Sequence, residues 1–403
     1  MGKPLEGIRV VELGTHVAVP IAARMMADWG ADVIKVEPPT GEPWRTIGES
    51  YGVPIREDHN PCFQPENANK KSLVINLKDP AGLEVFMKLV GTADIFISNT
   101  RPKALQKLGV DYESLKAKFP KLIYGHFSGY GPLGPEKDRP GFDVAAYWMK
   151  GGMPAEWTLK GHPPFKPQAG FGDATCGSLL LNGLLAALIA RDKTGQGDYL
   201  QISLYGSAIW FNLNGIITSQ PQYGMKFPRG KEDYKAPWNA MYQSKDGDWF
   251  TWSLPDWNKR YKEFLAAVHL EKYADDPRFS SIAATSENIV FVIDAIEEAF
   301  LAMGTDELVK NLTECDFVFN RAVNTAEIPT DEQALANGYI TTLTMEDGVD
   351  VAMPSNPLQF ASFKPEFKLA PHLGQDTKQV LADLGYDGKA VEELVGKGAV
   401  VSK

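Results

Sequence analysis

The feature that most constrains the fold is a regular alternation of apolar strand patterns and amphipathic helix patterns along residues 8–127. Helical patterns separate the strands, beginning with 20–31, where Pro20 suits the first turn of a helix and Gly30 suits its end. Strands separated by helices form parallel sheets whose two faces the helices cover. We therefore predict an α/β fold. The strand patterns are 8–13, 32–37, 72–77, 94–98 and 121–127.

Residues 174–192 are apolar nearly all round, which predicts a deeply buried helix. From about residue 222 the pattern of the chain changes. Residues 239–254 have the pattern of a hairpin that turns at Asp246 and Gly247, and helical patterns follow it. We predict two domains, a Rossmann-like parallel-sheet large domain (1–221 and 331–403) and a smaller α+β domain (222–330).

Composition argues against several classes of protein. The 403 residues have a formal net charge of −10, which is unsuited to a general nucleic-acid binder. Apolar runs fall short of the roughly 18 residues of a membrane span, and the N-terminus leads directly into a strand pattern. The three cysteines suit a reducing cytosol, and the six scattered histidines lack the spacing of a zinc site. We expect a cytoplasmic protein with no membrane anchor, secretory signal or metal.

Three common catalytic patterns fit poorly. The turn at 14–20 lacks the G-x-G-x-x-G glycines of dinucleotide-binding proteins. Within 125–129, Ser128 lies one position late for the G-x-S-x-G nucleophile of hydrolases. Cys176 lies inside the apolar helix, where a cysteine is usually inert packing. NAD binding, serine hydrolysis and a cysteine nucleophile are therefore disfavoured.

Basic residues gather next to the ends of predicted strands. Lys70 and Lys71 precede one strand, and Arg101, Lys103 and Lys107 follow another. In open α/β sheets the ligand crevice lies outside the carboxyl ends of the strands, and a helix N-terminus there can hold a phosphate. These residues are either a phosphate-binding patch or a solvated charged face, and their pattern alone favours neither.

Asp173 lies between a glycine and the apolar helix, and two interpretations fit it. The first is an N-cap, because aspartate is a preferred residue at that position. The second is a nucleophile, because the helix dipole would keep the carboxylate ionised in an otherwise apolar setting.

Seven stretches, in order along nearly the whole chain, resemble the class III CoA-transferases. That group includes formyl-CoA and carnitine CoA-transferases and their racemase relatives. The stretches are LEGIRVVELG, MMADWGADVIKVEPPTGEPWR, NANKKSLVINLKDPAG, ADIFISNTRPKALQKLGVDYESL, PGFD, GDATCGSLLLNGLLAALIARDKTGQGDYLQISL and PHLGQDTKQVLADLGY.

The resemblance implies that Asp173 is the nucleophile. Its carboxylate would attack an acyl-CoA thioester to give an acyl-aspartyl anhydride, which the CoA thiolate would convert into an aspartyl-CoA thioester. This chemistry needs no metal and no permanently bound cofactor, since the CoA thioester is itself a substrate. It does require that water be excluded and that the thiolate stay close. The resemblance also implies an interlocked, ring-through-ring homodimer.

The family's CoA contacts carry over to several positions. An arginine that often follows the second strand is replaced by Pro38, and either Arg45 or Lys71 is a candidate to compensate for it. The matched positions, together with the two lysines of the basic pattern, are Val17, Ala18, Lys70, Lys71, Asn99, Thr100, Arg101, Lys107, Ser128, Gly129 and Tyr130.

Two alternatives within the family are disfavoured. The racemase relatives need a histidine before the aspartate of their GHD motif, and Phe142, which cannot move a proton, occupies that place before Asp143. A non-catalytic CoA-binding homologue would be free to lose Asp173, which this chain keeps.

The expected substrates are an acyl-CoA and a free carboxylic acid. The stretches ENANKKSLVINLKD and YGPLGPEKDRPGFD resemble the subgroup that acts on 2-hydroxy acids such as phenyllactate and 2-hydroxyisocaproate in amino-acid fermentation. The glycine-rich loop of the formyl-CoA enzymes is not recognisable, which argues against formate or oxalate. The predicted small domain is rich in aromatic residues, which either line an acyl pocket or build that domain's core or an interface. They are Trp238, Tyr242, Trp249, Phe250, Trp252 and Trp257.

Overall fold

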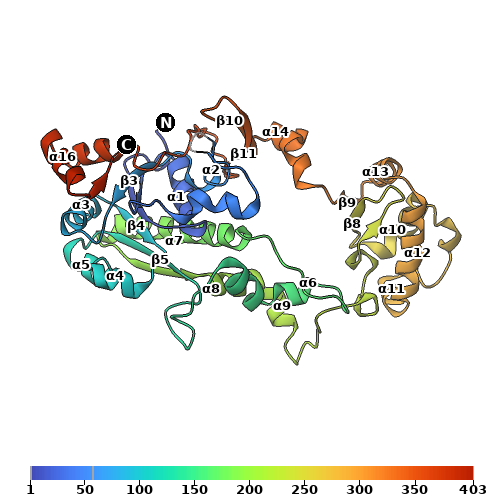
Figure 1. Ribbon diagram of the computed structural model, residues 1–403. Helices are drawn as coiled ribbons and strands as arrows, with labels where there is room; N and C mark the ends of the chain where they lie inside the picture. The colour runs from blue at the N-terminus through green and yellow to red at the C-terminus, as the bar shows by residue number, and fades with distance from the viewer. Residues whose placement is uncertain (1, 57–58, 403) are drawn as a thin grey trace. The chain divides into compact units, whose positions relative to one another are not determined.

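The computed structural model describes residues 2–56 and 59–402, whose contacts form two compact units that are described in turn (Figure 1). Residues 154–165, which the sequence pattern assigned to the large domain, group with unit 2. Unit 1 is Met1–Met153, Lys166–Ile216 and Glu332–Lys403, and unit 2 is Pro154–Phe165 and Ile217–Asp331.

Unit 1 contains a mainly parallel sheet, which confirms the predicted α/β class. Its strands are β1 (Arg9–Leu13), β2 (Asp32–Glu37), β3 (Lys71–Ile75), β4 (Ile95–Ser98), β5 (Ile123–Ser128), β6 (Tyr199–Ser203) and β12 (Val400–Val401). Within the described residues their order is β12-β3-β2-β1-β4-β5-β6, and each neighbouring pair is parallel except β12 with β3. The six parallel strands thus have the order of a doubly wound nucleotide-binding sheet.

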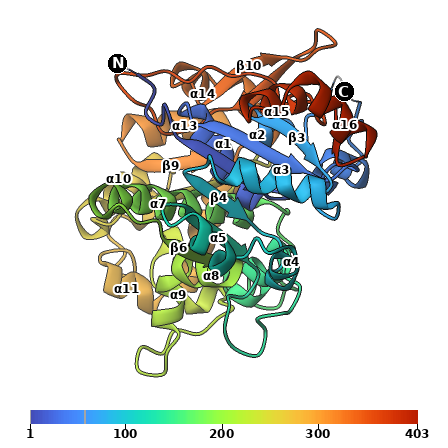
Figure 2. The ribbon, with the colours of Figure 1, turned by 90° about the vertical axis from the view of Figure 1, so that its left-hand side faces the viewer.

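Helices cover both faces of this sheet, and Figure 2 views it from the side of α3, α4 and α5. On β1, Val10 packs with residues of α1 and α7, whereas Val11 packs with residues of α3 and α15. Because successive residues of a strand point to opposite faces, burial on both faces explains the uninterrupted apolar strands. The helices of unit 1 are α1 (Ala18–Asp28), α2 (Gln64–Asn67), α3 (Pro80–Val90), α4 (Pro102–Leu108), α5 (Tyr112–Lys118), α7 (Phe171–Thr194), α8 (Leu204–Phe211), α14 (Glu332–Ala336), α15 (Thr377–Asp383) and α16 (Gly388–Gly396).

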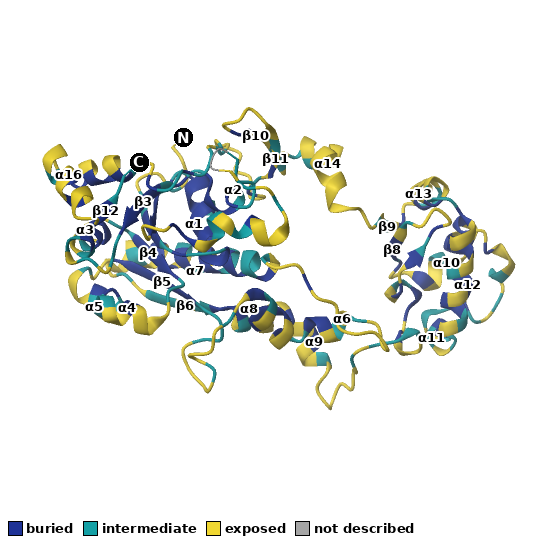
Figure 3. Ribbon diagram, viewed as in Figure 1, coloured by how far each residue is buried: buried dark blue, intermediate teal, exposed yellow. Residues whose placement is uncertain are grey.

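The apolar helix α7 is less buried than its sequence predicts. It ends at Gly195, whose φ of 72° is the left-handed conformation expected after a helix. Eight of its 24 residues are buried, whereas Ile189 is 60% exposed. The prediction of a deeply buried helix is therefore wrong for a single chain (Figure 3). Within the described residues, α7 is the one helix long and apolar enough to cross a membrane by length and composition alone.

Unit 2 has an antiparallel sheet packed against helices. The predicted hairpin is present, with β7 (Tyr242–Gln243) and β8 (Trp249–Ser253) joined by a turn in which Gly247 has a φ of 94°. Four of the six aromatic residues, namely Tyr242, Phe250, Trp252 and Trp257, are buried in this unit's core, which favours the core interpretation over an acyl pocket. The other elements are β9 (Val318–Arg321), α9 (Leu213–Thr218), α10 (Trp257–Ala267), α11 (Ile282–Glu287), α12 (Ile289–Ala302) and α13 (Thr305–Glu314), with α6 (Met153–Trp157) and α9 spanning the boundary with unit 1.

A second hairpin belongs to unit 1. Strands β10 (Ile340–Thr344) and β11 (Asp350–Pro354) pair antiparallel, and Gly348 in their turn has a φ of 82°. The turn residues Asp347 and Gly348 are of the Asp-Gly type that favours tight hairpin turns.

Candidate active site

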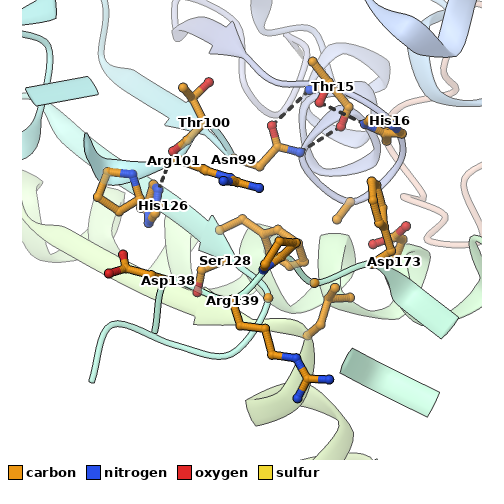
Figure 4. A pocket seen from close by; sticks show the side chains of 18 of the residues that line it. Thr15, His16, Asn99, Thr100, Arg101, His126, Ser128, Asp138, Arg139 and Asp173 are labelled. Atoms are coloured by element: carbon orange, nitrogen blue, oxygen red, sulfur yellow. Dashed lines mark hydrogen bonds between the residues drawn. The ribbon is translucent and has the colours of Figure 1, made fainter. Parts of the chain in front are cut away.

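A cavity of about 310 Å³ lies in unit 1 at the carboxyl ends of the parallel strands (Figure 4). Strands β1 and β4 are neighbours there, although the chain proceeds from β1 to β2, so the strand order reverses at this point. Doubly wound sheets bind their ligands at such a reversal. The walls come from the turn after β1 (15–18), the segment after β4 (99–103), the end of β5 (126–129), the loop 137–142, Leu204 and Asp173.

Asp173 lies in the first turn of α7 but does not cap it. The N-cap residue is Gly170, with a φ of 98°, and no side chain of this helix forms a capping hydrogen bond. The backbone N–H of Gly170 instead donates to Oδ2 of Asp143 at 2.5 Å. The N-cap interpretation of Asp173 was therefore wrong, because a carboxylate from another segment already occupies the end of the helix.

Asp143 approaches α7 closely because residue 172 is glycine. A Cβ atom on Gly172 would lie 2.2 Å from Oδ1 of Asp143 and 2.5 Å from the Tyr147 ring. That Oδ1 atom is buried and has no hydrogen-bond partner among the described residues. Burial raises the pKa of Asp143, and N–H groups of the first turn of α7 lower it in part.

The pKa of Asp173 is raised to about 7, first by burial and then by the negative charge of Asp143. The expectation that the helix terminus would keep this carboxylate strongly ionised was therefore wrong. Two interacting carboxylates at one helix end resemble pairs in which the charge of one disfavours ionisation of the other. Near neutral pH, Asp173 is therefore divided between its protonated and its ionised form.

The raised pKa of Asp173 leads to a testable pH dependence. If Asp173 is the nucleophile that the family resemblance implies, its active carboxylate form increases as pH rises, and wild-type kcat/KM should increase through about pH 7. Asp143→Asn keeps an acceptor for Gly170 but removes the neighbouring charge, so the midpoint should move to lower pH. Burial remains, so the midpoint should stay above that of an exposed aspartate. A pH profile whose midpoint is unchanged in the variant would contradict this coupling.

The side chain of Asn99 joins the ends of β1 and β4. Its Oδ1 accepts from the backbone N–H of Thr15 at 3.0 Å, and its Nδ2 donates to the Thr15 carbonyl at 2.8 Å (Figure 4). Both polar ends of the amide are thus used on the protein backbone. Asn99 shapes the cavity by holding the turn after β1 in place.

Comparison with known proteins decides the family. Residues 5–377 match CoA-transferase family III. The chain belongs to CoA-transferase family III. It is 37% identical to the (R)-2-hydroxy-4-methylpentanoate CoA-transferase of Clostridioides difficile, covering 97% of this chain and 98% of that protein. It is 35% identical to the cinnamoyl-CoA:phenyllactate CoA-transferase of Clostridium sporogenes, covering 96% and 95%.

A solved structure agrees with this assignment. A CAIB/BAIF family protein from Brucella suis superimposes with a TM-score of 0.83 at 26% identity, covering 95% of this chain and all of that one. Family membership makes this chain an enzyme, a family III CoA-transferase.

Seven of the predicted CoA contacts of the transferase line the cavity together with Asp173. They are Val17, Ala18, Asn99, Thr100, Arg101, Ser128 and Gly129. Three further cations, Lys103, Lys137 and Arg139, line it as well, and all three are exposed. Sequence reasoning counted Lys103 in its basic cluster but missed Lys137 and Arg139, although the loop PEKDRP before Gly141 carries both charges.

The other four predicted contacts do not line this cavity. Lys70 is buried, and its Nζ donates to Glu12 at 2.7 Å, to the Pro20 carbonyl at 2.8 Å and to Asn67 at 3.0 Å. Lys71 pairs with Asp32 at 2.7 Å. Lys107 is exposed on α4, and Tyr130 packs beneath Arg139.

Neither candidate to replace the arginine missing at Pro38 lines the cavity. Arg45 forms an ion pair with Glu37 at 2.7 Å, and its guanidinium lies 4.0 Å from the centre of the Phe63 ring. Lys71 is held by Asp32. The cations that line the transferase cavity come instead from segments 99–103 and 137–142.

Cys176 of the transferase is inert packing, as its sequence context suggested. Its side chain is fully buried, and burial raises the pKa of its thiol to about 12. A thiol in that state is not the nucleophilic thiolate. Among residues 2–56 and 59–402, no three His, Cys, Asp or Glu side chains are grouped to hold a metal ion.

Proposed function

We propose that this transferase moves CoA between an acyl-CoA and a free 2-hydroxy acid, with Asp173 as the nucleophile. The observation that carries the proposal is the half-buried carboxylate of Asp173 in a cavity whose walls include Arg101, Lys103 and Arg139. These cations suit the phosphates of CoA, in a chain whose net charge is −10. The names of the two relatives support a 2-hydroxy acid as one partner of the exchange.

In the proposed reaction, an oxygen of the Asp173 carboxylate attacks the thioester carbonyl carbon and the CoA thiolate leaves. The product is a mixed anhydride between Asp173 and the acyl group. The thiolate then attacks the Asp173 carbonyl, which gives an aspartyl-CoA thioester and releases the first acid as its carboxylate. The carboxylate of the second acid repeats these two steps in reverse and regenerates Asp173.

The surroundings of Asp173 suit these intermediates. An anhydride must be kept from water, and the apolar side chains of Val17, Phe142 and Leu204 line the cavity with Asp173. The thiolate must remain close enough to attack the aspartyl carbonyl, and anchoring the phosphates of CoA on the cations of the same cavity would make that attack effectively intramolecular.

A panel of acceptors tests this function. We expect purified enzyme to transfer CoA from one 2-hydroxyacyl-CoA to branched and aromatic 2-hydroxy acids, with much lower kcat/KM for oxalate, formate and carnitine. Chromatographic separation of the acyl-CoA products measures the transfer. A preference for oxalate or carnitine would contradict the proposed substrate class. Exchange of the α-proton with deuterated water in the absence of transfer would instead indicate racemase chemistry.

We also propose that the enzyme is a cytosolic homodimer. Large apolar side chains of unit 1 are exposed, including Phe171 at 61%, Ile189 at 60% and Trp210 at 64%, and they would be covered by a second copy (Figure 3). The interlocked arrangement is an inference from resemblance to the family. Cys62, Cys176 and Cys315 are free thiols, as the reducing cytosol favours. Light scattering should give twice the 44.3 kDa mass of the chain, and a monomer would contradict the dimer.

A further inference from the structure

His16 occupies a strained position in the wall of the cavity. Its φ of 65° lies in the left-handed region, which a non-glycine residue adopts only when the surroundings compensate. Figure 4 shows its ring at the same end of the cavity as Asp173, whereas His126, Thr100 and Asp138 lie toward the other end.

The neighbouring contacts agree with this placement. The His16 ring lies 5.4 Å from the Phe142 ring in an edge contact, and Phe142 precedes the Asp143 whose carboxylate binds the N-terminus of α7. Val17, the residue after His16, comes within 3.9 Å of where a Cβ on Gly170 would lie. His16 therefore stands beside the helix end that carries Asp173.

Three contacts hold the His16 backbone and ring in this orientation. Its backbone N–H donates to Oε2 of Glu42 at 2.8 Å, and Glu42 is itself buried and paired with Lys35. Its Nδ1 lies 2.9 Å from Oγ1 of Thr15, so that ring nitrogen is already occupied. The Phe142 edge contact limits the rotation of the ring. The remaining nitrogen, Nε2, has no hydrogen-bond partner among the described residues.

Two other neutral polar side chains of the cavity, Asn99 and Ser128, already have partners. Both ends of the Asn99 amide bind Thr15, and Oγ of Ser128 accepts from the backbone N–H of Gly131 at 3.1 Å. Burial lowers the pKa of His16, Glu42 raises it by less, and Lys35 lowers it further, so its imidazole is neutral at physiological pH. A neutral imidazole nitrogen either donates or accepts one hydrogen bond.

We propose that Nε2 of His16 hydrogen-bonds the 2-hydroxyl group of the acyl substrate and so selects 2-hydroxy acids. This inference rests on the proposed function. The carbon that bears the hydroxyl is bonded directly to the carbonyl carbon that Asp173 attacks, so the hydroxyl must lie at the Asp173 end of the cavity. A site built to bind a hydroxyl discriminates strongly against an analogue that lacks it, because a polar group of the site is then left unpaired.

The test compares kcat/KM for a matched pair of acceptors, 2-hydroxy-4-methylpentanoate and 4-methylpentanoate, at pH 8. We expect the wild-type enzyme to prefer the hydroxy acid, and His16→Phe to reduce that preference about 10-fold or more. Asparagine tolerates the left-handed backbone conformation, but its side chain is shorter than that of histidine and would not reach the 2-hydroxyl group. His16→Asn should therefore reduce the preference for the hydroxy acid similarly, even if His16→Phe folds poorly. Because the measured quantity is a ratio, a general loss of active enzyme does not alter it.

His126→Phe is the matched control, since this buried histidine lines the opposite end of the same cavity. Its ratio should remain that of the wild type. A wild-type ratio in both His16 variants, or an equal fall in the His126 variant, would overturn the role of His16 while leaving the proposed function intact. A wild-type enzyme that transfers CoA equally well to both acids would instead refute the 2-hydroxy acid assignment, and this inference with it.

Discussion

Asp173→Asn should abolish CoA transfer, lowering kcat by about three orders of magnitude or more, while the protein folds normally. An amide cannot form the mixed anhydride, so the chemical route is lost and not merely slowed. Stability should be retained or improved at pH 8. The folded-state pKa of about 7 lies above the unfolded value, so ionised Asp173 destabilises the fold increasingly as pH rises through that interval. Steady-state transfer assays and thermal unfolding measure the two effects.

Asp192→Asn is the matched control for this variant. Asp192 lies on the same helix α7, but it is exposed near the opposite end, so its substitution should leave transfer unchanged. The intermediate offers a second readout, because acyl-CoA should make the wild-type enzyme sensitive to hydroxylamine. Peptide mapping should then find the modified residue at Asp173 and not at Cys176. An active Asn variant, or a label confined to the cysteine, would remove Asp173 from the mechanism.

Lys35→Met should lower the free energy of unfolding by about 3–5 kcal/mol, which is typical when one partner of a buried ion pair is removed. The Lys35 ammonium is fully buried and lies 2.7 Å from both Glu12 and Glu42. Burial alone would lower its pKa, but Glu12 and Glu42, together with Glu37, raise it further than burial lowers it. Without the ammonium, Glu42 would be left as a buried charge that has lost its ion-pair partner. Chemical denaturation of the variant and the wild type, both in the same oligomeric state, measures the change in the free energy of unfolding.

The same substitution should impair transfer. Nζ of Lys35 also donates to the Gly14 carbonyl at 3.1 Å, and Glu42 holds the backbone N–H of His16. Losing the charge cluster therefore loosens the turn that forms one wall of the cavity. Lys397→Met, which removes an exposed pair with Glu393, should change neither stability nor transfer measurably. A loss of stability in Lys35→Met no larger than in this control would show that the buried cluster contributes little.

Local sequence patterns were sufficient to predict the class of fold. The short apolar runs of the strands and the helical spacing between them are properties of short segments, so the parallel sheet was predictable without knowledge of tertiary contacts. The second hairpin and the last two helices, α15 and α16, were predictable for the same reason. The proposed role of Asp173 as the nucleophile came from resemblance to the family and not from spacing, because an aspartate at a helix start is more often a cap.

What only the tertiary structure decided is which distant residues meet. The strand order places β1 beside β4, so Thr15 and Asn99, 84 residues apart, share two hydrogen bonds. The tertiary structure also brings Asp143 to the end of α7, where its carboxylate binds the N–H of Gly170 and adds to the effect of burial in raising the pKa of Asp173. Tertiary contacts can also make a charged residue unavailable to a ligand. Lys70, a lysine beside a strand, was predicted to contact CoA, but it is paired with Glu12 of β1. The sequence determines which side chains are charged. The order of strands in the sheet determines which residues those side chains pair with, and the pairing determines whether a charge is available to a ligand.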